Sequence, residues 1–124
     1  METKNKRKQR YKELKQLYKE MKPPMGAYII RNTVNGKAFM NVSKDIKSTF
    51  NSYRFQLKMG SLMVRELQQD WKEYGEEAFE FEVLEELEYD EKGEKIDYSE
   101  ELEIMKMIWL ERLSENETLQ LYKK

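Results

Sequence analysis

The sequence predicts a small α/β domain in which a three-stranded antiparallel sheet is flanked by helices, with an extra helix at the N-terminus. Three observations support this class. Two β-prone segments are joined by Asn35-Gly36, a pair that is common in hairpin turns. Residues 78–87 alternate apolar and polar side chains, as a strand does. The remaining segments repeat apolar residues every three or four positions, which is the spacing of an amphipathic helix.

The first half of the chain predicts a helix, a hairpin and a second helix. Pro23 and Pro24 end the first helix, because proline cannot continue the helical hydrogen bonding. The hairpin follows, and Ser43 lies where it would cap the next helix. The expected elements are residues 4–21, 25–31, 37–42 and about 44–57.

The second half predicts two more helices and one strand. Gly60 interrupts the chain before the first of these helices, and Gly75 ends it. The strand alternates in a way that predicts one solvated face. The expected elements are residues 62–73, 78–87 and 99–113. The apolar residues expected to face inward on the last helix are Leu102, Met105, Ile108, Trp109 and Leu113.

The composition limits the chemistry that is open to this chain. Its 124 residues suit one domain, and 39% of them are hydrophobic. Neither cysteine nor histidine is present, which excludes disulfides, thiolate metal sites and the commonest general base. Catalysis would therefore rest on carboxylates, tyrosines, lysines or a metal held by oxygen atoms. The sequence has no secretory signal and no apolar run of about 20 residues, so we expect a cytoplasmic protein with no membrane partner.

The net charge of −1 hides a strong asymmetry along the chain. Residues 1–22, which we call the basic arm, carry nine Lys or Arg and three Glu. Residues 76–103 carry fourteen Asp or Glu and two Lys. The arm could bind DNA phosphates, pair with the acidic segment within one chain or between two, or simply be solvated. The candidate DNA-binding residues are Lys6, Arg7, Lys8 and Arg10.

Several local sequences resemble the GIY-YIG nuclease superfamily, which is named for motifs on its first two strands. Residues 26–28, Gly-Ala-Tyr, match the first motif, and residues 39–41, Phe-Met-Asn, match the second. Residues 35–37 match the turn that usually joins the strands, and residues 55–87 look like the bacterial branch of the family. The resemblance covers residues 25 to about 113. It implies a GIY-YIG-like domain over residues 25–124, preceded by the basic helix of residues 1–22.

Members of this family cut DNA phosphodiesters with a divalent metal, and the resemblance assigns their site positions in this chain. Tyr28 retains the first motif tyrosine, whereas Phe39 replaces the second. Thr49 stands where the family has an arginine that stabilises charge on the phosphate. Tyr53 occupies the next position, a histidine or tyrosine in the family. Lys106 stands where a glutamate holds the metal.

Arg54 and Glu103 offer little replacement for the family arginine and glutamate that are missing at positions 49 and 106. Arg54 is five residues after Thr49, which puts it on another face of the helix. Glu103, one turn before Lys106, is the nearest acidic substitute for the metal ligand. In addition, Asn41 replaces the second motif glycine, so a side chain lies where the family leaves space.

These substitutions predict a degenerate GIY-YIG-type domain that binds or associates with a partner without cutting DNA. The partner is DNA through the arm, another protein or a second copy, and no cofactor is expected. The alternative is a divergent endonuclease that uses Tyr28, Tyr53 and Glu103 with Mg²⁺ or Mn²⁺. A plainer interpretation also remains, in which Tyr28, Phe39 and Tyr53 are core residues, and Thr49 and Lys106 face solvent.

Leu62, Met63 and Val64 are a candidate interface. Three consecutive apolar side chains at a helix start cannot all face one core. At least one of them should therefore be exposed or cover a partner, unless the N-terminal helix packs over them.

Overall fold

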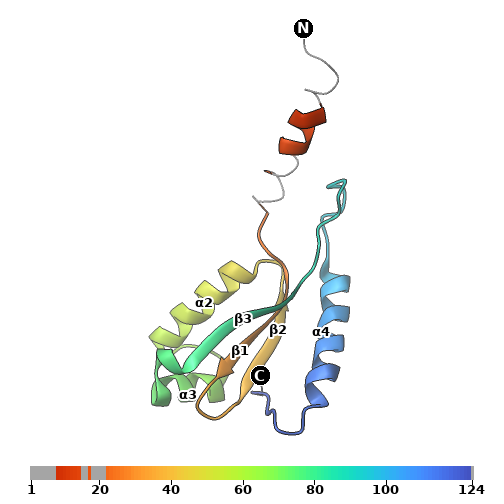
Figure 1. Ribbon diagram of the computed structural model, residues 1–124. Coiled ribbons are helices and arrows are strands. Elements are labelled where there is room, and N and C mark those ends of the chain that lie inside the picture. Colours follow the sequence, from red (N-terminus) through yellow and green to blue (C-terminus); the bar gives the residue numbers. More distant parts are fainter. Residues whose placement is uncertain (1–7, 15–16, 18–21, 124) are drawn as a thin grey trace.

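A three-stranded antiparallel sheet forms the centre of the domain, as the computed structural model of residues 8–14, 17 and 22–123 shows. The strand order is β2-β1-β3, and Figure 1 shows helices on both sides of the sheet. The strands are β1 (Gly26–Asn32), β2 (Ala38–Ser43) and β3 (Phe79–Glu86). The helices are α2 (Ile46–Met59), α3 (Arg65–Tyr74), the 3₁₀ helix η1 (Glu76–Ala78) and α4 (Ser99–Ser114). The predicted fold class is therefore confirmed.

The predicted N-terminal helix is only partly covered by the described residues. Residues 8–14 and 17 are helical, and the other positions of the predicted 4–21 helix lie outside the described part of the chain. Across that described part, no helix has both the length and the apolar character needed to cross a bilayer.

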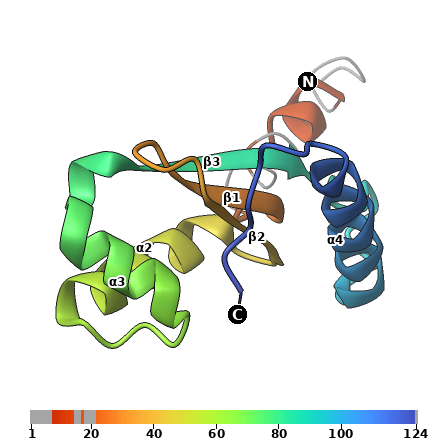
Figure 2. The ribbon, with the colours of Figure 1, turned by 90° about the horizontal axis from the view of Figure 1, so that it is seen from below.

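Helices lie on both sides of the sheet. β3 shows the predicted solvated face in its first half, where Glu80 and Glu82 are exposed and Phe79 and Phe81 are turned inward. Figure 2 shows α2 and α3 on one side and α4 on the other. The side under α2 and α3 holds the larger hydrophobic cluster, which includes Tyr28 and Leu67. On the other side, Ile29 and Met40 pack with Trp109 of α4. Leu84 of β3 joins this second cluster, because its place in the alternation turns it toward α4.

A β-bulge shifts the pairing between β1 and β3 at Ala27 and Tyr28. Gly26, just before the bulge, lies so close to β3 that a Cβ atom there would be 2.0 Å from the carbonyl oxygen of Glu85. β3 itself is an edge strand, and four of its five exposed positions are glutamates, the fifth being Val83. These glutamates are Glu80, Glu82, Glu85 and Glu86.

The hairpin between β1 and β2 is confirmed, but its turn differs from the expected one. The loop closes through the Asn32 N–H, which donates to the Lys37 carbonyl at 2.8 Å. Only Gly36 uses a positive φ, of 76°; Asn35 does not. Asn35 acts through its side chain instead, because its Oδ1 accepts from the Lys37 N–H and its Nδ2 donates to Asp70.

Two helix starts differ from the prediction. Asp45, not Ser43, caps α2, because its carboxylate accepts from the Ser48 N–H at 3.1 Å. Ser43 remains in β2, and its hydroxyl accepts from the Asp45 N–H at 2.9 Å. The next helix begins at Arg65 rather than at residue 62. The left-handed Gly60 ends α2, and residues 61–64 form an irregular connection. The directions of the side chains from Leu62 to Val64 are therefore not set by helical geometry.

The inward face of α4 is also narrower than predicted. Leu102 and Met105 are buried, and Trp109 and Leu113 pack on the second cluster. Ile108, however, is exposed. Ile108 lies about 100° from Trp109 around the helix, which places it outside the buried face of α4.

A polar network joins the hairpin, α3 and the C-terminal segment. Asn32 is fully buried, and its Nδ2 donates to the Tyr122 hydroxyl at 3.0 Å. The Tyr122 hydroxyl donates to Asp70 Oδ2 at 2.6 Å. The C-terminal segment is held further by a parallel bridge between Leu121 and Ala38 on the outer edge of β2. The network thus fixes α3 against the sheet on the side that carries the candidate site.

Candidate functional site

The two tyrosines of the candidate site are hydrogen-bonded to each other. The Tyr28 hydroxyl donates to the Tyr53 hydroxyl, with an oxygen–oxygen distance of 3.1 Å. Tyr28 comes from β1 and is 1% exposed, whereas Tyr53 comes from α2 and is half-buried. The Tyr28 ring meets Phe50 edge-on at 5.4 Å, and the Tyr53 ring meets Phe39 at 5.8 Å. The structure therefore brings Tyr28, Phe39 and Tyr53 together in one aromatic cluster.

Burial determines the protonation of Tyr28. Desolvation raises the pKa of its hydroxyl far above the usual value of 10.0, and the hydrogen bond with Tyr53 raises it further. The raised pKa means that the phenol resists ionisation even in mild alkali, and in the folded chain its O–H donates a hydrogen bond to Tyr53.

The raised pKa of Tyr28 predicts a loss of stability in alkali. Above about pH 10 the unfolded chain releases the Tyr28 proton, while the folded chain keeps it. The folded state then binds more protons, so the free energy of unfolding falls by up to about 1.4 kcal/mol per pH unit from this group. Urea denaturation from pH 8 to pH 11 measures the slope. Tyr28→Phe should reduce it, and an equal slope in that variant would contradict this assignment.

Thr49 links the end of β2 to the start of α2. Its Oγ1 shares a hydrogen bond with Ser43 Oγ, and the two oxygens are 2.6 Å apart. The Ser43 hydroxyl also accepts the Asp45 N–H, so this pair fixes the entry into the helix. Thr49 and Tyr53 are four residues apart and share one helix face, as expected from the sequence.

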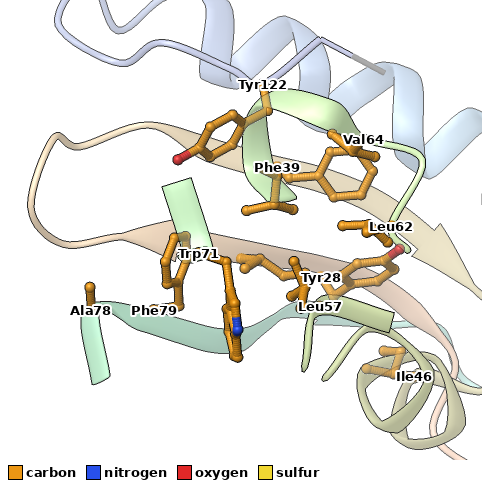
Figure 3. Packing of buried hydrophobic residues seen from close by; sticks show 12 residues of the cluster. Tyr28, Phe39, Ile46, Leu57, Leu62, Val64, Trp71, Ala78, Phe79 and Tyr122 are labelled. Carbon is orange, nitrogen blue, oxygen red and sulfur yellow. The ribbon is translucent and has the colours of Figure 1, made fainter. Parts of the chain in front are cut away.

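A shallow pocket of about 300 Å³ opens beside Thr49 and Tyr53. The seven residues that line it are uncharged: Thr49, Ser52, Tyr53, Gln56, Leu62, Met63 and Val64. Leu62 and Val64 are buried and point into the same cluster as Tyr28 and Phe39 (Figure 3). Met63 is 84% exposed, which confirms that one residue of this apolar triplet is left uncovered.

Ser52 and Gln56 also line this pocket, although nothing in their residue types marks them as site residues. The signal was present, because they lie three residues after Thr49 and three residues after Tyr53 on neighbouring helix turns. Their neutral side chains give no reason to connect them with phosphate chemistry.

The fold has been compared with known proteins. No family model and no curated protein matches the sequence. Among solved structures, the catalytic domain of homing endonuclease I-TevI aligns with a TM-score of 0.62 and 22% identity, over 81% of this chain and 99% of that one. A glutamate-to-alanine mutant of the catalytic domain of intron endonuclease I-TevI gives a TM-score of 0.60 and 24% identity, over 73% and 84% of the two chains. I-TevI is a GIY-YIG homing endonuclease.

The chain therefore has a GIY-YIG-like fold.

Arg54 does not line the pocket beside Tyr53. Its guanidinium lies over the Phe81 ring, 4.2 Å from the centroid, and about 5.9 Å from that of Phe50. Arg54 is thus packed on the β3 side of α2, away from the pocket, in line with the prediction that it lies on another helix face from Thr49.

Lys106 and Glu103 lie on α4, which packs on the opposite face of the sheet from α2. Lys106 is half-buried. Glu103 is exposed and lines a different pocket, of about 850 Å³, together with Lys44 and Lys95. The contacts described for this chain do not bring either residue to Tyr28. Asn41, at the second motif glycine, is half-buried, and its Oδ1 accepts from the Val42 N–H at 2.8 Å.

The divalent metal of the GIY-YIG family does not fit the residues found around Tyr28. Mg²⁺ usually binds through one or two carboxylates together with waters and substrate phosphates, and no carboxylate of the described residues lines the pocket beside Tyr53. Within residues 8–14, 17 and 22–123, no group of three or more acidic side chains is placed to hold an ion. The pocket itself offers two hydroxyls, a phenol and an amide. We therefore derive no reaction step through a metal.

The candidate DNA-binding residues are only partly described. Lys6 and Arg7 lie outside the described residues, whereas Lys8 and Arg10 are exposed. Arg10 forms a loose ion pair with Glu13 at 3.8 Å. DNA binding through the arm stays a prediction.

Proposed function

We propose that this chain is a non-catalytic binding module built on a GIY-YIG-like frame. The observation that carries the proposal is the uncharged pocket beside Tyr53, where the family resemblance would put a phosphate-binding arginine. Cleavage of a phosphodiester develops negative charge, and a preorganised partner for that charge contributes about 3 to 4 kcal/mol of transition-state stabilisation. Thr49 cannot supply this, because its hydroxyl is neutral and already bonded to Ser43.

The tyrosine pair supports the same conclusion. Tyr28 is buried, neutral and directed at Tyr53, so its proton is shared inside the cluster rather than with a bound water. Removing the second motif hydroxyl at Phe39 leaves an aromatic contact in place of a polar one. The aromatic residues at these site positions therefore contribute packing contacts rather than catalytic groups.

The lining of the pocket favours a neutral partner. Leu62 and Val64 anchor the connection between α2 and α3, which leaves Met63 projecting beside the pocket. Methionine adapts its shape to irregular apolar contacts. We infer that this surface accepts an uncharged side chain of a partner protein, with Ser52 and Gln56 available for hydrogen bonds at its rim.

The alternative function, a divergent endonuclease, needs Glu103 near Tyr28 and Tyr53. Because Glu103 lines another pocket and lies on the other helical layer, the geometry favours the non-catalytic proposal.

A nicking assay on supercoiled plasmid with millimolar Mg²⁺ or Mn²⁺ tests the proposal. We expect no cleavage above the buffer blank, for both the wild type and Tyr28→Phe. Calorimetry with either metal should give no saturable binding. Metal-dependent nicking by the wild type that is abolished in Tyr28→Phe would overturn the proposal in favour of the endonuclease. Nicking that is equal in both proteins would indicate a contaminant.

A further inference from the structure

Helix α4 carries a second apolar surface that faces away from the sheet. Ile104, Met107 and Ile108 are 51%, 67% and 42% exposed. Their i, i+3 and i+4 spacing makes them neighbours on one side of the helix. We call this side, with its flanking glutamates, the α4 outer face. A cluster of three large apolar side chains at this exposure suits a protein contact better than it suits water.

The α4 outer face is also acidic. Glu100 and Glu111 are exposed and lie on the same side of the helix as the apolar triplet, and the exposed Glu103 lies at the edge of that side. Arg112, four residues after Ile108, borders the same face, and its guanidinium lies 5.1 Å from the Trp109 ring. Lys106 lies on the other side of the helix. The outer face of the helix thus combines an apolar centre with three glutamates and one arginine at its rim, so its charge is negative overall.

The basic arm is complementary to the α4 outer face both in its apolar side chains and in its charge. Tyr11, Leu14 and Leu17 are exposed and helical, and their i, i+3 spacing places each beside the next on a helix surface. Arg10 lies between Leu14 and Leu17 in angle around the helix, so a cation borders the apolar stripe. The arm as a whole holds nine basic and three acidic residues.

We propose that the basic arm of one copy packs along the α4 outer face of a second copy, and that the contact is formed twice in a symmetric dimer. Charge selects this pairing. Two α4 outer faces would place glutamates against glutamates, and two arms would place lysines and arginines together. An arm packed on α4 instead pairs opposite charges around the apolar side chains of both surfaces.

The connection between the arm and the sheet favours a second copy over the chain's own α4. Lys22 and Pro23 each precede a proline, which restricts them to extended backbone and opposes a tight reversal. The Tyr89 hydroxyl donates to the Pro23 carbonyl at 2.5 Å and holds this segment near β3. Figure 1 draws the helical residues of the arm apart from the sheet and its helices.

The test uses two full-length variants with opposite defects. The arm variant is Leu14→Glu with Leu17→Glu, and the face variant is Ile104→Glu with Ile108→Glu. Analytical ultracentrifugation should find a dimer for the wild type and a monomer for each variant. An equimolar mixture of the two variants should associate again, because an intact arm then meets an intact face. Each variant alone should weaken dimerisation by at least about tenfold per lost apolar side chain.

Phe55→Glu, at an exposed apolar position of α2, is the matched control and should leave the wild-type dimer unchanged. Circular dichroism confirms that all variants are folded. A monomeric wild type at about 100 µM, a mixture that stays monomeric, or an arm variant that still dimerises would each overturn the proposal. A monomeric wild type whose DNA affinity is lost in the arm variant would assign the arm to nucleic acid instead. None of these outcomes depends on the nicking assay.

Discussion

Gly26→Ala is expected to lower the free energy of unfolding by about 3 to 5 kcal/mol, through steric overlap and backbone strain together. A Cβ atom at position 26 would lie 2.0 Å from the Glu85 carbonyl oxygen and 2.9 Å from the Glu86 Cα. Both contacts are to backbone atoms of β3, which cannot move away without breaking the pairing with β1. The φ of 149° adds strain, because residues with a Cβ rarely adopt it.

Urea denaturation monitored by circular dichroism measures this loss. Gly36→Ala is the matched control, since Gly36 also has a positive φ, of 76°, but a Cβ there would meet nothing within 4 Å. The control should lose only about 1 kcal/mol, from its left-handed backbone alone. Equal losses in the two variants would show that close approach to β3 is not what requires glycine at position 26.

Tyr28→Ala should be the second strongly destabilising change, at about 3 to 5 kcal/mol, the usual range for removing a buried aromatic ring. The ring is 1% exposed and contacts Phe50 and Tyr53. Tyr28→Phe keeps the ring and removes only the hydroxyl, so it should cost about 1 kcal/mol or less, since the partner hydroxyl of Tyr53 can turn to solvent.

This pair of variants, measured in the same denaturation experiment, separates the packing role of Tyr28 from its polar one. A large loss in Tyr28→Phe, comparable to that of Tyr28→Ala, would mean that the hydroxyl pair, not the ring, holds β1 against α2. A loss below about 1 kcal/mol in Tyr28→Ala would contradict a core role altogether.

The parts of the fold that sequence predicts well are those set by local chemistry. Gly60 and Gly75 end helices through their own backbone conformations, and the loop at Gly36 needs a positive φ, so each leaves a signal at its own position. Ser43 was misjudged because a serine ahead of a helix resembles a cap, whereas the true cap depends on which side chain reaches the Ser48 N–H.

Contacts between distant segments could not be predicted in the same way. Asn32 meets Tyr122 across 90 positions, and no periodicity in either segment indicates it. The inward assignment of Ile108 failed for a similar reason, because the width of a buried helix stripe depends on the sheet beneath it. At the candidate site, the shared helix face of Thr49 and Tyr53 followed from spacing alone, but the hydrogen bonds of their hydroxyls to Ser43 and Tyr28 did not.

The acidic outer edge of β3 bears on how this protein avoids aggregation. An unpaired edge strand offers its backbone to any passing extended chain, and charged side chains are a common safeguard against such pairing. The four glutamates of β3 carry that safeguard along its whole length. Fibril growth from this edge is therefore opposed by charge, and a partner that adds a strand here would need lysines or arginines of its own.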